Sequence, residues 1–176
     1  MRADISDAPG QAAIFPGLEE LVCFAVYSAG HAFNRVYQPL LEQIGLTYPQ
    51  YLVMIALWSK DDQTVSELGE RLFLESSTLT PLLKRLETTG YINRTRDPAD
   101  ERHVRIRLTG TGRALQKKAR EIPRCILEAA GLSLADLRRL QRQITAIRQN
   151  LLKYVSGREP TIAAGPIRRS SGRRKG

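Results

Sequence analysis

The stretch "TVSELGERLFLESSTLTPLLKRLETTGYINRTRDPADERHVRIRLT", residues 64–109, decides the fold because two short helical segments stand directly before a basic hairpin. Thr64 with Glu67 three residues later is the pattern of a helix N-terminus with a capping box. In "SSTLTPLLKRLETTG", Ser77 or Thr78 is expected to cap a second helix over 77–89, with Pro81 in its first turn and Gly90 at its end. This order of elements predicts a winged helix-turn-helix.

The wing is predicted from a change of period between residues 91 and 109. Apolar residues alternate with arginines along "HVRIRLT", which is the pattern of a half-buried strand. "YINRTR" supplies a second strand, and "DPADER" separates the two. We therefore expect a two-stranded hairpin with a charged tip.

Helices are predicted on both sides of this unit. Apolar residues at 18, 21, 22, 25, 29, 33 and 36 follow helical spacing, which predicts a helix over 17–37. "PLLEQIG" is expected to form a separate short helix or turn that ends at Gly45. Thr47 is expected to cap the next helix, with Pro49 in its first turn, where a missing N–H costs nothing.

Two further helices are predicted after the wing. The segment 110–131 is expected to bend at Pro123, and Ser133 is expected to cap a helix over 133–155. That last helix has a narrow apolar stripe in a 3-4-3-4 spacing, formed by Leu137, Leu140, Ile144, Ile147 and Leu151. Such a stripe favours helix-against-helix packing with a partner subunit, and packing within one chain is the alternative.

The predicted fold class is mainly α with a β wing, in which N- and C-terminal helices form a dimerisation domain. A length of 176 residues is typical of one domain. We expect a flexible N-terminus over 1–16 and a single domain over 17–155. Within it, 17–46 and 112–155 are the dimerisation helices and 47–111 the winged helix-turn-helix. The remainder, 156–176, is expected to be a disordered basic tail.

The charge of the chain favours a nucleic-acid partner. Its formal net charge is +9, and the stretch from 157 to the end holds six Arg or Lys against one Glu. The chain has neither an apolar run long enough to span a membrane nor the apolar core of a signal peptide, which predicts a cytoplasmic protein. Its two cysteines and two histidines lack metal-ligand spacing, so neither a metal nor a cofactor is expected.

The helix over 77–89 is predicted to read DNA. Short hydroxyl side chains at its start suit phosphate and base-edge contacts beside free backbone N–H groups, and two cations about two turns along reach the DNA backbone. The alternative is that the serines only cap the helix and the cations are only solvated. The candidate residues are Ser76, Ser77, Thr78, Thr80, Lys84 and Arg85.

The wing tip is the second candidate DNA contact. Arg102 on a slender hairpin suits a narrow minor groove, and Asp100 is expected to hold its guanidinium in a bidentate pair. The other arginines of the hairpin are expected to neutralise phosphates, although a solvated charged face is the alternative. They are Arg94, Arg96, Arg105 and Arg107.

"DERHVRIRLTGTG" resembles the wing of the MarR family of dimeric winged-helix regulators. Within that family, "LVCFAVYS", "YQPLLEQIGLTYPQYLVMIALW", "TVSELGERLFLESSTLTPLLKRLE" and "REIPRC" resemble OhrR-type repressors, which sense organic hydroperoxides. The resemblance covers roughly residues 18 to 130. The chain departs from the pattern at Glu75, Ser77 and His103.

The resemblance implies roles for both cysteines. Cys23 takes the place of the sensing thiol, which a hydroperoxide oxidises to sulfenic acid. Tyr37 and Tyr48 match the tyrosines that hydrogen-bond that sulfur, and Tyr27 matches a third tyrosine near it. Cys125 takes the place of the resolving thiol of the two-cysteine branch, which forms a disulfide with the sensing cysteine of the other subunit. Asp100 and Arg102 match the wing-tip pair.

The residues themselves bear on Cys23. Free cysteine is usually a buried packing residue, so two inert thiols are the plain alternative. Cys23 and Tyr37 are 14 residues apart, or about 21 Å along one helix, so a contact between them requires a break in the helix or a second subunit. Phenolic donors would stabilise the thiolate, which is the form that attacks a peroxide.

These patterns lead to one expected function and two alternatives. We expect a DNA-binding repressor, a homodimer and not an enzyme, which an organic hydroperoxide releases from operator DNA. A thiol peroxidase is one alternative, since the same thiol consumes hydroperoxide. The other is a repressor relieved by a small phenolic ligand at the dimer cleft.

Overall fold

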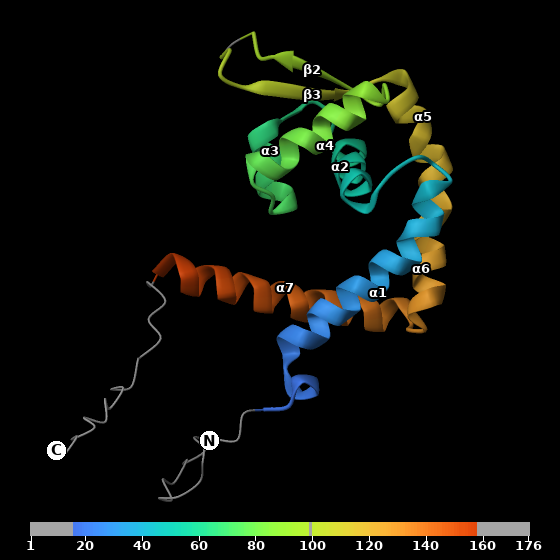
Figure 1. Ribbon diagram of the computed structural model, residues 1–176, viewed down its shortest axis with the longest axis vertical. Coiled ribbons are helices and arrows are strands. Elements are labelled where there is room, and N and C mark those ends of the chain that lie inside the picture. Colours follow the sequence, from blue (N-terminus) through green and yellow to red (C-terminus); the bar gives the residue numbers. More distant parts are fainter. Residues whose placement is uncertain (1–15, 99, 158–176) are drawn as a thin grey trace, which may run out of the picture. The chain divides into compact units, whose positions relative to one another are not determined.

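The structure of the chain is a computed structural model that describes residues 16–98 and 100–157 (Figure 1). The chain divides into two compact units with the boundary between Ala130 and Gly131, and each is described by itself. The first unit holds 3-10 turns at Leu18–Glu20 (η1) and Ala119–Glu121 (η2). Its helices are α1 Val22–Glu42, α2 Tyr48–Ser59, α3 Val65–Leu72, α4 Ser76–Thr88, α5 Gly110–Lys118 and α6 Ile122–Ala130. Its strands are β1 Gln63–Thr64, β2 Ile92–Arg96 and β3 Val104–Leu108, and the second unit holds α7 Leu134–Gly157.

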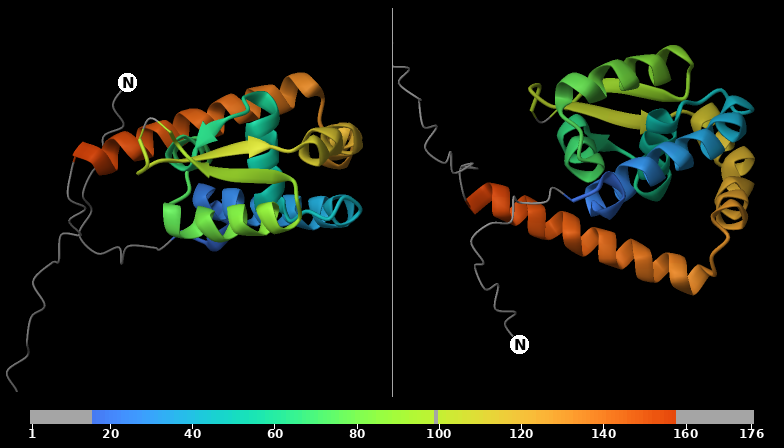
Figure 2. Two further views of the ribbon diagram at one scale, coloured as in Figure 1. Left: turned by 90° about the horizontal axis from the view of Figure 1, so that it is seen from above. Right: turned by 60° about the horizontal axis from the view of Figure 1, so that its bottom comes forward.

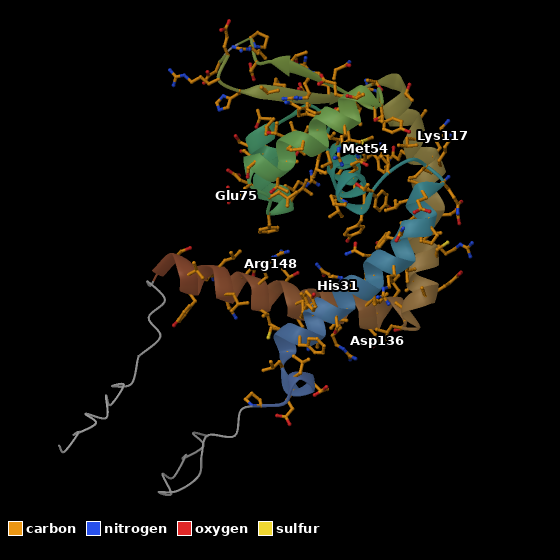
Figure 3. The ribbon with its side chains drawn as sticks, in the orientation of Figure 1. His31, Met54, Glu75, Lys117, Asp136 and Arg148 are labelled. Atoms are coloured by element: carbon orange, nitrogen blue, oxygen red, sulfur yellow. The ribbon has the colours of Figure 1, made fainter. Side chains whose placement is uncertain are left out.

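The helix-turn-helix is formed by α3 and α4. As predicted, Thr64 caps α3, because its Oγ1 accepts from the Glu67 N–H at 3.1 Å and its N–H donates to Glu67 Oε2 at 2.7 Å. The predicted start of α4 is wrong. The N-cap is Glu75, at the junction of α3 and α4 (Figure 3), because its carbonyl already accepts from the N–H groups of Thr78 and Leu79. Ser77 therefore lies inside the helix.

Pro81 also lies deeper in α4 than predicted, beyond the first turn. Because proline has no N–H, Pro81 cannot donate to the carbonyl four residues earlier. The helix continues through Pro81 with that one backbone hydrogen bond missing. The end of α4 is as predicted, since Gly90 adopts a φ of +75° and the Tyr91 N–H donates to the Leu86 carbonyl.

The predicted hairpin is confirmed, and the structure adds a third strand. β2 and β3 pair antiparallel from Ile92 opposite Leu108 to Arg96 opposite Val104, and β1 pairs antiparallel with the other edge of β3. The hairpin lies alongside α4 (Figures 1 and 2). The two residues of β1 carry too short a pattern to predict a strand from sequence.

The prediction of a separate helix or turn at "PLLEQIG" is wrong, because α1 continues through Pro39 to Glu42. Proline has a helical φ, and here it removes only one backbone donor. Gly45, with a φ of +67°, closes the segment as predicted. Thr47 is the N-cap of α2, and its N–H donates to Gln50 Oε1 at 2.8 Å.

The predicted bend at Pro123 takes the form of the turn η2 just before that proline, which stands in the first turn of α6. Ser133 caps α7 as predicted, since its Oγ accepts from the Asp136 N–H at 3.1 Å. α7 extends two residues past the expected end at 155. The rest of the predicted tail, and all but the last residue of the predicted flexible N-terminus, lie outside the described residues. The single-domain prediction concerns both units together and stays a prediction.

The core of the first unit lies among α2, α3, α4 and the sheet. The interior face of α4 is an example, because Leu79, Leu83 and Leu86 are all completely buried. Each such side chain contributes roughly 1.5–3 kcal/mol on burial. The largest fully buried side chains are Leu41, Met54, Leu57, Leu68, Leu79, Leu83, Leu86, Ile92, Ile106 and Val53. This packing fixes α4 and the wing relative to each other.

Candidate DNA-binding face and thiol site

α4 turns its apolar stripe into the core and its polar side chains outward. Ser76, Ser77 and Thr78 are exposed at its N-terminal end, and Thr80 is half-buried. Lys84 and Arg85 are exposed further along the helix. Free hydroxyls beside backbone N–H groups, followed by two cations, form a surface suited to a phosphate backbone.

The arginines of the wing fall into two groups. Arg105 and Arg107 bond the carboxylate of Asp62, and Arg94 is half-buried 3.7 Å from Glu87. Arg96 and Arg102 are exposed, and among the described residues neither has an acidic partner. Two of the five wing arginines are therefore exposed to solvent and form no ion pair with a described carboxylate.

The wing tip differs from the expected geometry. Asp100 Oδ1 accepts from the backbone N–H of Arg102 at 3.0 Å, and its Oδ2 lies 3.3 Å from His103 Nδ1. The expected bidentate pair with the Arg102 guanidinium is not formed, because the carboxylate closes the turn through the backbone. Asp100 thus shapes the tip and leaves the guanidinium of Arg102 available.

Three tyrosines form a cluster where α1 meets α2. The rings of Tyr37 and Tyr48 have centroids 4.7 Å apart, and those of Tyr37 and Tyr51 are 5.9 Å apart. Burial, then the charges of Tyr48 and Tyr51, raise the pKa of Tyr37 to about 12. Burial raises the pKa of the other two phenols as well. All three therefore keep their O–H at neutral pH and can donate a hydrogen bond.

Sequence reasoning missed Tyr51, although it stands one helical turn after Tyr48 and so shares its face of α2. It also missed His31 on α1 (Figure 3), whose ring lies 4.4 Å from that of Tyr27 in an edge-on contact. Tyr27 is exposed and stands apart from the other tyrosines along α1.

The two cysteines are free thiols, Cys23 exposed near the start of α1 and Cys125 half-buried in α6. α1 is continuous from Val22 to Glu42, so Cys23 and Tyr37 are held about 21 Å apart within one chain. The structure brings Tyr37 and Tyr48 together but does not bring Cys23 to them. A site containing all three needs a second chain.

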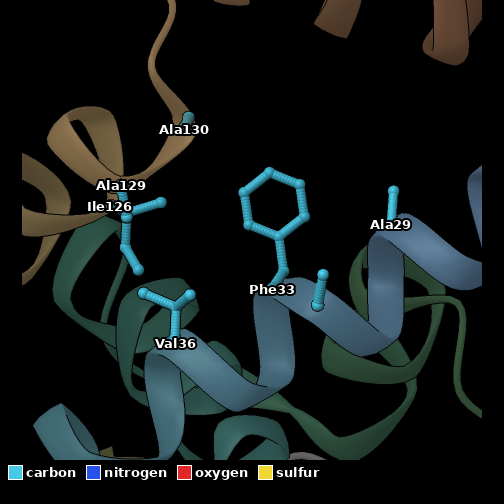
Figure 4. Close-up of a pocket in the computed structure, with 7 residues that line it drawn as sticks. Ala29, Phe33, Val36, Ile126, Ala129 and Ala130 are labelled. Carbon is cyan, nitrogen blue, oxygen red and sulfur yellow. The ribbon is translucent and has the colours of Figure 1, made fainter.

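A pocket of about 160 Å³ lies between α1 and α6, on the stretch of α1 that separates Cys23 from Tyr37 (Figure 4). Phe33 and Val36 face Ile126 across it, and alanines complete its wall. Its lining carries only apolar side chains, which suits an alkyl or aromatic group.

In the part of the chain that the structure describes, no helix is both long and apolar enough to cross a membrane.

A helix-turn-helix with an exposed cationic face, beside a basic hairpin, defines a winged-helix DNA-binding regulator. Comparison with known proteins agrees. Residues 35–119 match the family described as transcriptional regulator SarA/Rot, a match that includes the tyrosines Tyr37 and Tyr48 and the wing but neither cysteine.

Individual relatives extend the match. The chain is 48% identical over 134 residues to the HTH-type transcriptional regulator TtmR of Methylorubrum extorquens, covering 76% of this chain and 69% of TtmR. It is 42% identical to the organic hydroperoxide resistance transcriptional regulator of Bacillus subtilis, covering 76% and 91%. The chain therefore belongs to the MarR family of winged-helix transcriptional regulators, and its resemblance to OhrR-type regulators is confirmed.

Solved structures agree with this assignment. The chain matches reduced AbfR bound to DNA, a protein of Staphylococcus epidermidis, with a TM-score of 0.68 and 34% identity over 78% of this chain and 94% of AbfR. The disulfide form of AbfR matches with a TM-score of 0.54 over 79% and 92%. The predicted fold class is thus confirmed.

Proposed function

We propose that the chain is a homodimeric repressor that organic hydroperoxides release from operator DNA by oxidising Cys23. The observation that carries the proposal is the unbroken helix α1, which joins an exposed thiol to a tyrosine pair about 21 Å away. In a two-fold dimer, Cys23 of each chain can meet Tyr37 and Tyr48 of the other. The dimer then builds two thiol sites that a single chain lacks.

The dimer is supported by the apolar surface of α1. Val22 and Tyr27 are each 64% exposed, and Val26 and Phe33 are also exposed. Exposed apolar patches of this kind mark interaction surfaces. A second copy that covers these side chains of α1 removes them from water and places the Cys23 end of the helix against another chain.

The first chemical step is a transfer of oxygen to sulfur. The Cys23 thiolate attacks the outer peroxide oxygen, the O–O bond breaks, and a proton converts the leaving alkoxide to an alcohol. Cys23 becomes a sulfenic acid, oxidised by two electrons, and the peroxide is reduced by two. The neutral phenols of Tyr37 and Tyr48 support the step by donating hydrogen bonds to the anionic sulfur.

The second step is the proposed role of Cys125. Its thiol attacks the sulfenic sulfur of the partner chain, a disulfide forms, and water leaves. The Cα atoms of the two cysteines must come within about 7 Å for that bond. Because α6 continues from α5 and the wing, movement of Cys125 would change the spacing of the two wings, and half-site spacing governs operator affinity.

The DNA contacts proposed for this repressor are the hydroxyls of Ser76, Ser77, Thr78 and Thr80, the cations Lys84 and Arg85, and the wing. Two relatives support the proposal. AbfR has been solved reduced on DNA and with a disulfide formed, and the Bacillus relative carries organic hydroperoxide resistance in its name.

A gel-shift experiment tests the proposal. Reduced protein should bind operator DNA and release it after a stoichiometric amount of cumene hydroperoxide, while Cys23→Ser should bind and stay bound. Mass spectrometry of the same samples should find one added oxygen on Cys23 when Cys125→Ser blocks the second step. Release of DNA with Cys23 unmodified would refute the mechanism.

The apolar pocket between α1 and α6 favours a second candidate function, relief of repression by a small aromatic ligand. It shares the DNA-binding face but makes no use of the thiol. In that case Cys23→Ser would still release DNA upon addition of a phenolic compound, and Val36→Trp, which fills the pocket, would block release.

A further inference from the structure

Asp62 stands in the turn between α2 and β1, immediately before the strand that pairs with β3. Its φ of +56° lies in the left-handed region, where aspartate is tolerated better than most residues other than glycine. Asp61 secures the turn, because its Oδ1 accepts from the N–H of Asp62 at 2.8 Å and from the N–H of Leu108 at 2.9 Å. The turn is thereby tied to the end of β3.

The carboxylate of Asp62 bonds two arginines of β3. Its Oδ1 accepts from Arg105 Nε at 2.7 Å and from Arg107 Nε at 2.9 Å, and its Oδ2 accepts from Arg107 Nη2 at 3.2 Å. The Asp62 carbonyl accepts from Arg105 Nη2 at 2.8 Å, and Asp97 Oδ2 accepts from Arg105 Nη1 at 2.9 Å. Hydrogen bonds from Arg105, then from Arg107, lower the pKa of Asp62, so it is charged at neutral pH.

The cluster Asp62, Asp97, Arg105 and Arg107 is therefore balanced, with two negative and two positive side chains. Arg96 and Arg102 have no such compensation among the described residues. A guanidinium that already holds a carboxylate must lose that partner before it can bond a phosphate. The uncompensated arginines lose no partner when they bind.

We propose that Asp62 is a positioning residue that reserves Arg105 and Arg107 for holding the wing strand, so that the wing binds DNA through Arg96 and Arg102. The inference rests on the proposed DNA contact of the wing and is independent of the thiol chemistry. Asp62 acts through β3 and does not itself touch DNA. By keeping two cations off the phosphates, it also limits binding to DNA of any sequence.

The salt dependence of binding measures this division directly. The slope of log K against log salt concentration changes by about 0.9 for each additional phosphate that the protein neutralises on duplex DNA. The probe is a random-sequence duplex, measured by fluorescence anisotropy over a series of salt concentrations. All variants are made in the full chain, so that any contribution of the C-terminal basic segment is the same in each.

Four variants give distinct expectations. Arg102→Gln should flatten the slope by about 0.9, while Arg107→Gln should leave it unchanged. Asp62→Asn keeps a side chain that accepts a positive φ but removes the charge, and it should steepen the slope by about 0.9 because it frees Arg107. The double variant Asp62→Asn, Arg107→Gln should return to the wild-type slope. Operator affinity relative to the random duplex should fall in Asp62→Asn.

The outcomes separate the two proposals. If Arg107→Gln flattens the slope as much as Arg102→Gln does, the reservation by Asp62 is wrong while the wing contact stands. If Arg102→Gln leaves the slope unchanged, the wing contact itself is wrong. Circular dichroism melts identify variants that fail to fold, and Arg107→Gln, whose side chain is 46% exposed, keeps the test decisive if Asp62→Asn is one of them.

Discussion

Replacing Gly112 with alanine should break the junction between the wing and α5. Gly112 is buried, and a Cβ built there would lie 2.0 Å from the carbonyl oxygen of Tyr91 and 3.3 Å from Leu108 Cδ2. Real Cβ atoms essentially never come within 3.0 Å of a neighbour, so one of the two backbones must move by about 1 Å. The Tyr91 carbonyl cannot simply turn away, because it accepts from the Thr109 N–H at 3.0 Å.

The magnitude follows from what that movement disturbs. Overpacking a tight site costs about 1–3 kcal/mol. The Gly112 carbonyl also accepts from Trp58 Nε1 at 2.9 Å, and its N–H donates to Thr109 Oγ1 at 3.0 Å. Losing one of these adds about 1 kcal/mol. Gly112→Ala should therefore cost about 3 kcal/mol, a large share of the roughly 5–15 kcal/mol that stabilise an ordinary domain.

Gly110 in the same turn of α5 is the matched control. A Cβ there meets nothing within 4 Å, and alanine at such a position gains about 0.4–1 kcal/mol. Urea unfolding followed by circular dichroism, at one protein concentration, should therefore separate the two variants by more than about 3 kcal/mol. Stabilities that agree within about 1 kcal/mol would refute the close approach of α5 to Tyr91.

Four further results are expected. Arg102→Ala should weaken operator binding by about 1–3 kcal/mol; an unchanged affinity would count against the wing contact. Cys125→Ser should leave the first oxidation of Cys23 intact but abolish the covalent dimer on non-reducing gels, and a persisting dimer would refute its resolving role. Arg105 and Arg107 lower the pKa of Asp62 from 3.8, so its contribution to stability is complete above pH 3.8 and is lost as the pH falls through the lowered pKa. The urea midpoint of Asp62→Asn should therefore fall less over that acid range than the midpoint of the wild type. Oxidation of Cys23 should slow on dilution below the dimer dissociation constant, as measured by thiol labelling, and a rate independent of concentration would contradict the shared site.

The elements with strong local signals were predictable from sequence. Thr64 and Glu67 mark the start of α3 because the side chain of each accepts a hydrogen bond from the backbone N–H of the other. Alternation of apolar residues with arginines marks β3. The errors occur where tertiary context competes with local preference. Pro39 ends a helix in most settings, yet α1 passes through it, and Leu41 beyond it is 1% exposed in the core.

The site was predictable where motifs of known spacing carry it. The resemblance pairs Tyr37 with Tyr48, and their rings do lie 4.7 Å apart. Asp62 gave no signal, because its hydrogen-bond partners lie on β3, more than 40 positions later in the chain. A single aspartate in a polar turn forms no sequence pattern that indicates its partners. Arg105 and Arg107 cannot be distinguished from solvated arginines until the register of β1 against β3 is known.

The geometry of α1 ties the chemistry of the chain to its assembly. α1 is a helix of 21 residues whose apolar side chains are partly exposed, which is costly in water, and its C-terminal end is fixed to the core through Leu41. Its other end carries Cys23, beyond reach of any tyrosine of the cluster in its own chain. In the proposed dimer, the contact that covers this surface also completes the thiol site, so the stability of the dimer and the reactivity of Cys23 depend on the same helix. The helix proposed to contact DNA does not depend on a second chain in this way, because the buried leucines of α4 fix it to the core of its own chain.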